Sequence, residues 1–394
     1  MYVTRPLSMY RKSPHTLATK PEVPNSGHLV LTDEEADAQD ILCWASCGIC
    51  KRKKVKKLPF PQDKILSVIY TSEYHETSTT KVWFLPVPYQ PLSSNCYYVI
   101  RAKGRHKGKA CTSSREGDII TCCFRDILRD KKPKPLNHRN IYQQFKIHRH
   151  QSGGFFAKSV APDGVPPKFL RRKGWKVRCS RTSHGSRLNE ALGIDTSLRE
   201  KLPDFNFPIF NVQFPSVIVG KWYCPFGFVR EKAGVKRQMK KTILYSLTLE
   251  QWWEEIYSCG NVNYGGNTVT VNEYVQREVS LVGGFEAVKD DRNGRGAFTW
   301  FKVYNPYGRK GVVSVGLSHE VVENMKWVLE EHGWVNGEER EVKVERVEEF
   351  RSENGWRKFG CYVLVESFVL RRLDGSLVLK CSFRHTDKIR CKWE

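Results

Sequence analysis

The chain has 394 residues, of which 40% are hydrophobic and 12% aromatic, and 65 Lys and Arg against 42 Asp and Glu give a formal net charge of +23. This apolar content excludes global disorder, and the ordinary numbers of Gly and Pro exclude a collagen-like or low-complexity chain. No apolar run is long enough for a transmembrane segment. No secretory signal is predicted. With thirteen Cys in no regular framework, this favours an intracellular protein, cytoplasmic with nuclear or peripheral-membrane association as further options.

The first half of the chain predicts a basic, β-rich domain. Residues 1–27 carry several Pro and Gly and predict an extended arm. Residues 28–182 form the predicted domain, and its expected strands are 29–32, 65–71, 82–88, 96–101, 153–160 and 175–179. Residues 183–215 then predict a helical connector that ends in a Pro-containing linker.

Residues 216–394 predict an α+β domain. Thr248 and Gln251 fit a capping box, which predicts a helix over residues 249–257, and an apolar face at helical spacing predicts a second helix over residues 320–331. The expected strands are residues 269–275, 279–288, 297–304, 342–348, 359–371 and 376–383. Asp374-Gly375 predicts a hairpin turn between the last two.

These elements together predict an α+β, β-rich fold with two antiparallel-sheet domains and a few short helices. A helix followed by strands occurs twice in the C-terminal half, which suggests a duplicated helix-plus-strands unit.

The positive charge is concentrated in one part of the chain. Residues 96–185 contain 22 cations and 5 anions, a net charge of +17. Such a field favours a phosphate-rich partner, either an anionic membrane lipid, a phosphorylated ligand or, as an alternative, nucleic acid. The same positive charge can equally keep the protein soluble or bind an acidic protein. The oligomeric state is not predictable from this pattern.

The densest basic run holds six cations in seven residues: Lys51, Arg52, Lys53, Lys54, Lys56 and Lys57. It must be solvated, and it fits a nuclear-import signal, a contact with an anionic surface, or a plain charged loop. Just before it lie Cys43, Cys47 and Cys50. Their spacing is compatible with an iron–sulfur cluster, with structural zinc or with free thiols. A fourth reading is S-acylation, since one lipid chain beside a polybasic run gives stable membrane anchoring.

A second basic segment has a cation at every odd position: Arg101, Lys103, Arg105, Lys107 and Lys109. In an extended strand these side chains would share one face and match a row of phosphates, whereas in a flexible hairpin tip they would be solvated separately. A third group, Arg171, Arg172 and Lys173, lies among aromatic residues. Cations interleaved with aromatics are also typical of single-strand nucleic-acid binders, although no recognition module is identifiable.

The sequence contains none of the common catalytic or nucleotide-binding motifs, so no cofactor, metal ion or catalytic residue is predicted. His385 with Asp387 could form a His–carboxylate pair, and Cys381 or Cys391 could be a nucleophile, but nothing in the sequence brings them together. The interpretation therefore leans away from an enzyme, with an enzyme of undetected class as a further alternative.

Five segments carry a resemblance to a known family: MYVTRPLS at 1–8, LPFPQD at 58–63, AKSVAPDG at 157–164, KWYCPF at 221–226 and TLEQWWE at 248–254. Through them the chain resembles, nearly end to end, a land-plant family defined only as a domain of unknown function, DUF1262. The resemblance implies an intracellular plant protein. It implies no activity, ligand or catalytic residue, because the family has none assigned.

Overall fold

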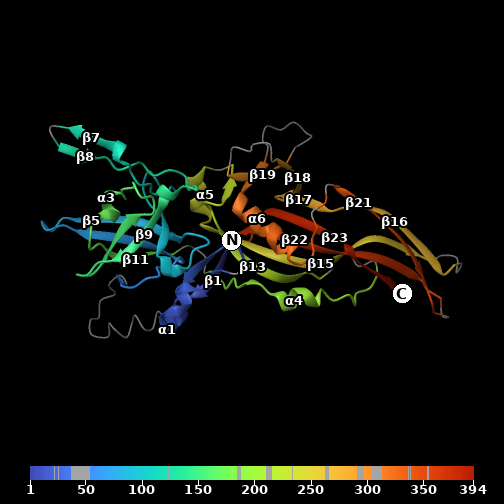
Figure 1. Ribbon diagram of the computed structural model, residues 1–394. Coiled ribbons are helices and arrows are strands. Elements are labelled where there is room, and N and C mark those ends of the chain that lie inside the picture. Colours follow the sequence, from blue (N-terminus) through green and yellow to red (C-terminus); the bar gives the residue numbers. More distant parts are fainter. Residues whose placement is uncertain are drawn as a thin grey trace. The chain divides into compact units, whose positions relative to one another are not determined.

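The computed structural model (Figure 1) describes residues 1–21, 23–24, 26–36, 54–122, 125–183, 188–209, 215–232, 234–261, 266–290, 297–303, 313–335, 337, 339–352 and 355–394. The chain divides into two compact units. Unit 1 comprises Met1–Ala191 and Tyr223–Leu244, and unit 2 comprises Leu192–Trp222 and Tyr245–Glu394. Each unit is therefore built from two separate stretches of sequence, whereas the sequence patterns predict contiguous domains.

Unit 1 is built on a seven-stranded sheet whose printed pairings are all antiparallel. In spatial order its strands are β10 (Phe155–Ser159), β9 (Gln144–Arg149), β6 (Cys96–Arg101), β5 (Thr77–Pro86), β4 (Lys64–Thr71), β11 (Lys176–Ser183) and β3 (Lys54–Val55). Alternating apolar residues form its core around Phe60, whose ring lies 4.6 Å from Phe84 and 5.1 Å from Phe155. A core of this kind is the main source of stability for a sheet domain.

Residues 1–27 are not an extended arm. They contain β1 (Tyr2–Pro6), α1 (Leu7–Lys12) and the 3-10 turn η1 (Pro14–Ala18), and β1 pairs in parallel with β2 (Gly27–Leu31). Tyr2 is 1% exposed, and its hydroxyl donates to the Pro86 carbonyl oxygen. A Cβ at Gly27 would lie 2.5 Å from the Tyr2 ring, so only Gly permits this pairing. The arm prediction failed because Pro and Gly here shape short elements that bury Tyr2.

The remaining elements of unit 1 are short. The helices are α3 (Lys168–Arg171) and α5 (Val235–Lys241), the 3-10 turns are η2 (Leu92–Ser94), η3 (Glu116–Asp118) and η4 (Ile141–Gln143), and the strands are β7 (Ile119–Cys122), β8 (Arg125–Leu128) and β14 (Val229–Glu231). The strand β13 (Val217–Pro225) contains residues of both units.

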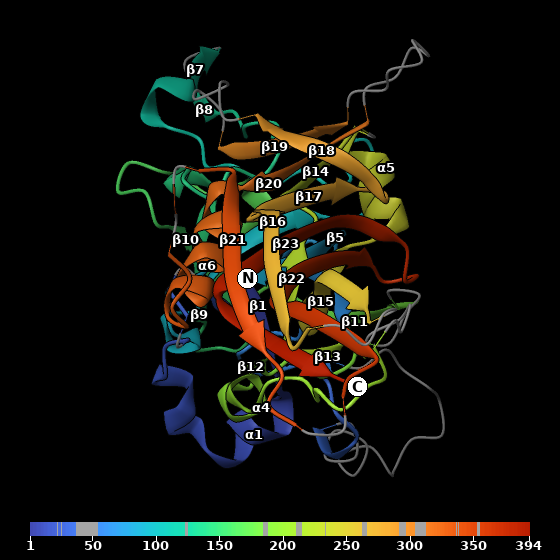
Figure 2. The same cartoon turned by 90° about the vertical axis from the view of Figure 1, so that its right-hand side faces the viewer.

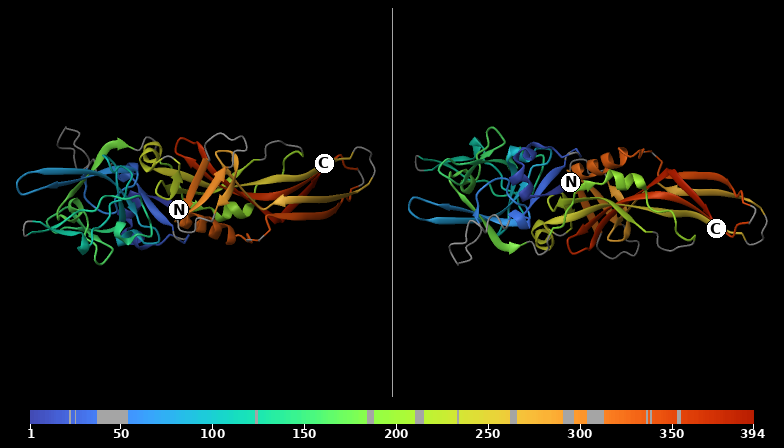
Figure 3. Two further views of the ribbon diagram at one scale, coloured as in Figure 1. Left: turned by 90° about the horizontal axis from the view of Figure 1, so that it is seen from above. Right: turned by 90° about the horizontal axis from the view of Figure 1, so that it is seen from below.

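Unit 2 is dominated by three long antiparallel strands, β15 (Leu244–Gly260), β22 (Lys358–Arg372) and β23 (Leu377–Trp393), which run beside one another in Figures 1 and 3. The sheet continues from β23 through β17 (Glu278–Val282), β18 (Phe285–Asp290) and β19 (Phe298–Val303) to β20 (Val313–Ser318). A separate pair, β16 (Thr268–Gln276) with β21 (Glu341–Glu349), is visible in Figure 2. The short elements β12 (Gly193–Ile194) and α4 (Thr196–Lys201) precede β13.

Several predictions for unit 2 are confirmed. The second expected helix is α6 (His319–Glu330), which buries Val321, Met325 and Leu329 on one face. The Asp374-Gly375 turn joins β22 to β23, and Gly375 has φ +85°. The structure is β-rich with few short helices and several antiparallel sheets, as predicted.

The first expected helix, residues 249–257, is instead part of strand β15. Its local capping signal is overridden by a ladder with β22 that runs from Tyr245 opposite Arg372 to Gly260 opposite Lys358. Burial alternates with a period of two, as Leu249, Gln251 and Trp253 are each at most 2% exposed. The expected duplicated helix-plus-strands unit therefore lacks the helix of its first copy.

Within the described residues, no helix combines the length and the apolar character needed to cross a bilayer.

Candidate anion-binding surface

The alternating-cation segment forms a hairpin loop and not an extended row. After β6 ends at Arg101, the chain turns, so that Gly108 N–H donates to the Arg101 carbonyl and Arg101 N–H donates to the Lys109 carbonyl. Gly104 and Gly108 both have φ +84°, which Gly adopts without strain. Of the two geometries that the sequence left open, the structure therefore has the hairpin tip and not the extended row, because two residues in the left-handed region turn the backbone.

This loop nevertheless concentrates positive charge around His106. Partial desolvation lowers the pKa of His106, and the charges of Lys109, Arg105, Arg101 and Lys132 lower it further. Lys132 lies beside the loop because Ala110 and Lys134 exchange backbone hydrogen bonds in both directions. All four named charges disfavour a further cation, so the same field attracts an anion.

Helix α5 adds a second set of cations to the loop. A Cβ at Gly108 would lie 2.9 Å from Val235 Cγ1, so the loop backbone packs directly on the first residue of α5. Helix α5 and the residue Lys232 before it present exposed cations: Lys232, Lys236, Arg237, Lys240 and Lys241. These residues were not predicted from the sequence, although five cations with no acid over residues 232–241 are a visible signal.

We call these groups together the basic surface, and its members are Lys103, Arg105, Lys107, Lys109, Lys132, Lys232, Lys236, Arg237, Lys240 and Lys241. In the part of the chain that the structure describes, no carboxylate forms an ion pair with any of them. Their charges are therefore available to an external anion.

The predicted group at 171–173 is largely engaged within unit 1. The Arg171 guanidinium lies 3.2 Å from an Asp130 carboxylate oxygen, and Arg172 lies over the Tyr70 ring at 4.6 Å. Lys173 is exposed. Arg101 stacks over Phe169 of α3 at 5.4 Å, which links this group to the base of the loop. Arg171 thus has an internal counter-charge, which makes it a weaker candidate than the loop cations.

The basic run at 51–57 is described only in part, since Lys51, Arg52, Lys53 and the cysteines Cys43, Cys47 and Cys50 lie outside the described residues. Lys54 lies on the edge strand β3 opposite Arg178, and Lys56 and Lys57 are exposed. In the order of the sheet, β5, β4 and β11 lie between β3 and the strand β6 that leads into the loop. The described cations of this run thus follow a different strand of the sheet.

Three of the aromatic residues among the cations of this region, Phe155, Trp175 and Tyr142, are packed and offer no free ring face for base stacking. Phe155 and Trp175 are at most 2% exposed within the core of unit 1. Tyr142 lies under Arg115, 4.1 Å from the guanidinium carbon, and its hydroxyl donates to Asp163. Single-strand binders need exposed ring faces, so the pattern of cations and aromatics that suggested nucleic acid is explained by packing.

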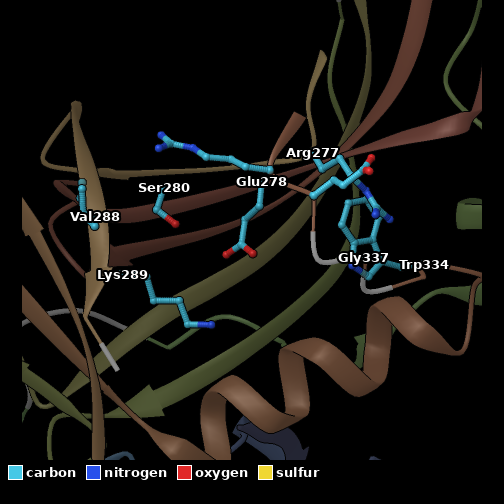
Figure 4. A pocket seen from close by; sticks show the side chains of 10 residues that line it. Arg277, Glu278, Ser280, Val288, Lys289, Trp334 and Gly337 are labelled. Carbon is cyan, nitrogen blue, oxygen red and sulfur yellow. The ribbon is translucent and has the colours of Figure 1, made fainter. Parts of the chain in front are cut away.

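Unit 2 contains a separate polar cavity of about 320 Å³ (Figure 4). Its polar lining comes from the start of β17, from β18 and from the loop after α6: Arg277, Glu278, Ser280, Lys289, Glu339 and Arg340. Arg277 stacks over Trp334 at 5.1 Å, and Arg340 pairs with Glu286 at 3.2 Å. Opposite charges are mixed in this lining, so the cavity presents no uniform field. No sequence motif marks it, because its lining residues come from distant segments.

Unit 2 also holds a buried ion cluster formed by Arg199, Glu366 and His385. Arg199 of α4 donates from Nε and Nη2 to the two Glu366 oxygens, both at 2.6 Å, and His385 Nε2 lies 3.0 Å from Glu366 Oε2. All three residues are 1% exposed. Burial alone would raise the pKa of Glu366, but hydrogen bonds from His385 and Arg199 and the Arg199 charge hold it well below its usual range.

The ion cluster contains His385, the histidine that the sequence suggested for a His–carboxylate pair with Asp387. His385 interacts with Glu366 and not with Asp387, and Cys381 is buried beside the Ser280 hydroxyl, with burial raising the pKa of the thiol to about 12. Among the described residues, no group of three or more His, Cys, Asp or Glu side chains is arranged to hold a metal ion. Buried in this way, the ion cluster is suited to anchoring α4 on β22.

Comparison with known proteins finds a family match for part of the chain. A family model described as a protein of unknown function, DUF1262, matches residues 22–124, which supports the resemblance to this domain of unknown function. No curated protein matches the sequence. Among solved structures, the chain is similar to the crystal structure of Cry35Ab1, with a TM-score of 0.45 and 13% identity over 85% of this chain and 90% of that one.

Proposed function

We propose that this protein is a non-enzymatic, intracellular plant protein that binds an anionic membrane surface through the basic surface of unit 1. The single observation that carries the proposal is the packing of loop 101–109 on α5, which gathers cations that lack carboxylate partners among the described residues. The charges that lower the pKa of His106 support it, because they report a positive field at the surface.

A membrane surface is favoured over nucleic acid by the nature of the contact. Lipid head groups form a continuous layer of negative charge, so Lys side chains on a loop and a short helix can contact it without any fixed spacing. Nucleic-acid binding remains the alternative, and the burial of Phe155 and Trp175 and the packing of Tyr142 under Arg115 weigh against single strands. An acidic protein partner is a further alternative, since charge alone also serves that contact.

The test is sedimentation of the purified protein with phosphatidylcholine vesicles that contain or lack phosphatidylserine. Each cation near an anionic surface contributes about 1 kcal/mol, so Lys103→Glu with Lys107→Glu should weaken binding at least ~30-fold. Raising the salt concentration should release the protein, because the Debye length falls from about 10 Å at 0.1 M to about 3 Å at 1 M.

The matched control is Lys146→Glu with Lys158→Glu. These exposed residues lie opposite each other on β9 and β10 and change the net charge of the same unit equally. The control variant should bind as the unaltered protein does. Equal loss in both variants would show a response to net charge alone and contradict the assignment of the surface. Binding to RNA in place of vesicles, with a steep salt dependence, would support the alternative.

A further inference from the structure

Two cysteines of unit 2 face each other across the last hairpin. Cys361 of β22 and Cys391 of β23 are directly opposite in the antiparallel register, and their sulfur atoms are 3.5 Å apart. Opposed residues of an antiparallel pair have Cα atoms about 4.5 or 5.5 Å apart, and both values fall within the about 4.4–6.8 Å range of disulfides. The register therefore places the two cysteines at a separation that a disulfide can span.

The other described cysteines of these strands have no such partner. Cys381 lies opposite Phe368, and Cys259 of β15 lies opposite Phe359. Cys259 belongs to the same apolar cluster as the facing pair but has a different cross-strand neighbour. The register thus selects one pair of thiols.

The surroundings give the two thiols different pKa values and different exposure to solvent. The hydrogen bond from the Cys391 thiol lowers the pKa of Cys361, and the nearby Arg346 charge lowers it further, against the effect of burial. The hydrogen bond to Cys361 and burial raise the pKa of Cys391. Cys361 is fully buried, whereas Cys391 is half-buried and can be reached from solvent.

We propose that Cys361 and Cys391 are a redox-active pair that closes to a reversible disulfide in the presence of a small disulfide oxidant such as oxidised glutathione. Moving the shared proton to Cys361 leaves a thiolate on the accessible Cys391, which attacks oxidised glutathione and releases one glutathione thiolate. The released glutathione thiolate takes up the proton of the Cys361 thiol. The resulting Cys361 thiolate attacks Cys391 Sγ in the mixed disulfide and expels the second glutathione thiolate, which takes up the proton that the pair first lost to solvent. Overall two thiols are oxidised and one glutathione disulfide is reduced to two glutathione molecules.

The experiment equilibrates the full-length protein in buffers of defined reduced-to-oxidised glutathione ratio. Free thiols are then alkylated and the cross-linked peptides identified by mass spectrometry. The expected product is a single Cys361–Cys391 cross-link, two hydrogen atoms lighter than the reduced peptides and reversed by dithiothreitol. The oxidised protein should melt on the order of 5–10 °C higher, since the cross-link restricts the unfolded chain.

Variants separate the pair from the other thiols. Cys361→Ser and Cys391→Ser should each abolish the cross-link and the rise in melting temperature, whereas Cys381→Ser, the control on the same strand, should retain both. Arg346→Gln should slow cross-link formation several-fold, and Arg346→Lys should restore the rate because it keeps the charge.

Two results would overturn the proposal. One is a folded protein in which both thiols are still alkylated after equilibration with oxidised glutathione. The other is a cross-link from either cysteine to Cys259 in the unaltered protein.

Discussion

Glu366→Gln should destabilise unit 2 strongly, because it removes the only carboxylate that the described residues place on buried Arg199. The Arg199 side chain is 1% exposed and cannot recover hydration. Glutamine keeps the size of the side chain but cannot accept both guanidinium bonds with a negative charge. Breaking a buried ion pair in this way costs about 3–5 kcal/mol. For a unit of this size the melting temperature should fall by roughly 6–20 °C.

The matched control is Glu254→Gln, which makes the same chemical change in a more exposed pair. Arg384 donates to the two Glu254 oxygens at 2.8 and 3.1 Å, and the two side chains are 16% and 33% exposed. Because solvent can replace part of this interaction, its loss should cost about 1 kcal/mol or less.

The assay is hydrogen exchange of β22 peptides, read by mass spectrometry across a urea series under reducing conditions, which follows unit 2 by itself. Arg199→Met combined with Glu366→Gln should also cost less stability than the sum of the two single changes, since the double variant leaves no unpaired buried charge. A cost of Glu366→Gln no greater than that of Glu254→Gln, or single costs that simply add in the double variant, would refute the role of the buried ion pair.

Three further predictions concern acid sensitivity and loop packing. The folded-state pKa of Glu366 is depressed, so ionised Glu366 stabilises unit 2 fully above the unfolded pKa of about 4.3, and this stability should be lost as the pH falls below that value. Glu366→Gln should not show this loss in an acid titration. Burial, with the Arg5 charge, lowers the pKa of His28 to about 4. Neutral His28 therefore contributes its full stability above pH ~6.5, and up to about 3 kcal/mol of the free energy of unfolding should be lost between pH 6.5 and 4. In His28→Gln the free energy of unfolding, measured by urea, should depend less on pH over that range. Gly108→Ala should lower the melting temperature of unit 1 and weaken vesicle binding more than Gly104→Ala, because both sites have φ +84° but only Gly108 also packs on Val235, and equal effects would show that the loop does not depend on that contact.

Local patterns predicted the parts of unit 2 that depend on neighbouring residues. The Asp374-Gly375 turn and the apolar face of α6 follow from preferences within one or two turns of chain. Strand β15 did not follow, because its capping signal is local whereas its burial depends on β22, more than a hundred residues away. The same distance hides the ion cluster, where Arg199 and Glu366 are separated by 167 positions.

For the candidate site, the charge composition predicted the part of the chain involved but not the geometry of the surface. The excess of cations over residues 96–185 pointed to unit 1, but the alternating pattern left open an extended strand or a hairpin tip, and the structure has a hairpin loop that contains two Gly residues. Nothing in the sequence indicates that this loop packs on α5, because Gly108 and Val235 are joined only by the fold. The cations of 232–241 were therefore assigned to no surface before the structure placed them.

Helix α5 gives a reason to regard its charges as functional. Lys236 and Lys240 are four residues apart, as are Arg237 and Lys241, and like charges at this spacing destabilise a helix by about 0.2–0.5 kcal/mol per pair. Lys236 and Arg237 also lie in the first turn, where a cation opposes the helix dipole, so a helix that served folding alone would gain from losing these two. Lys236→Gln with Arg237→Gln should therefore raise the stability of unit 1 slightly while it lowers the affinity for phosphatidylserine vesicles, two effects measurable on the same sample by melting and by sedimentation. Opposite signs are the result expected of a surface maintained for binding; a loss of stability without a loss of affinity would show that these cations support the fold instead.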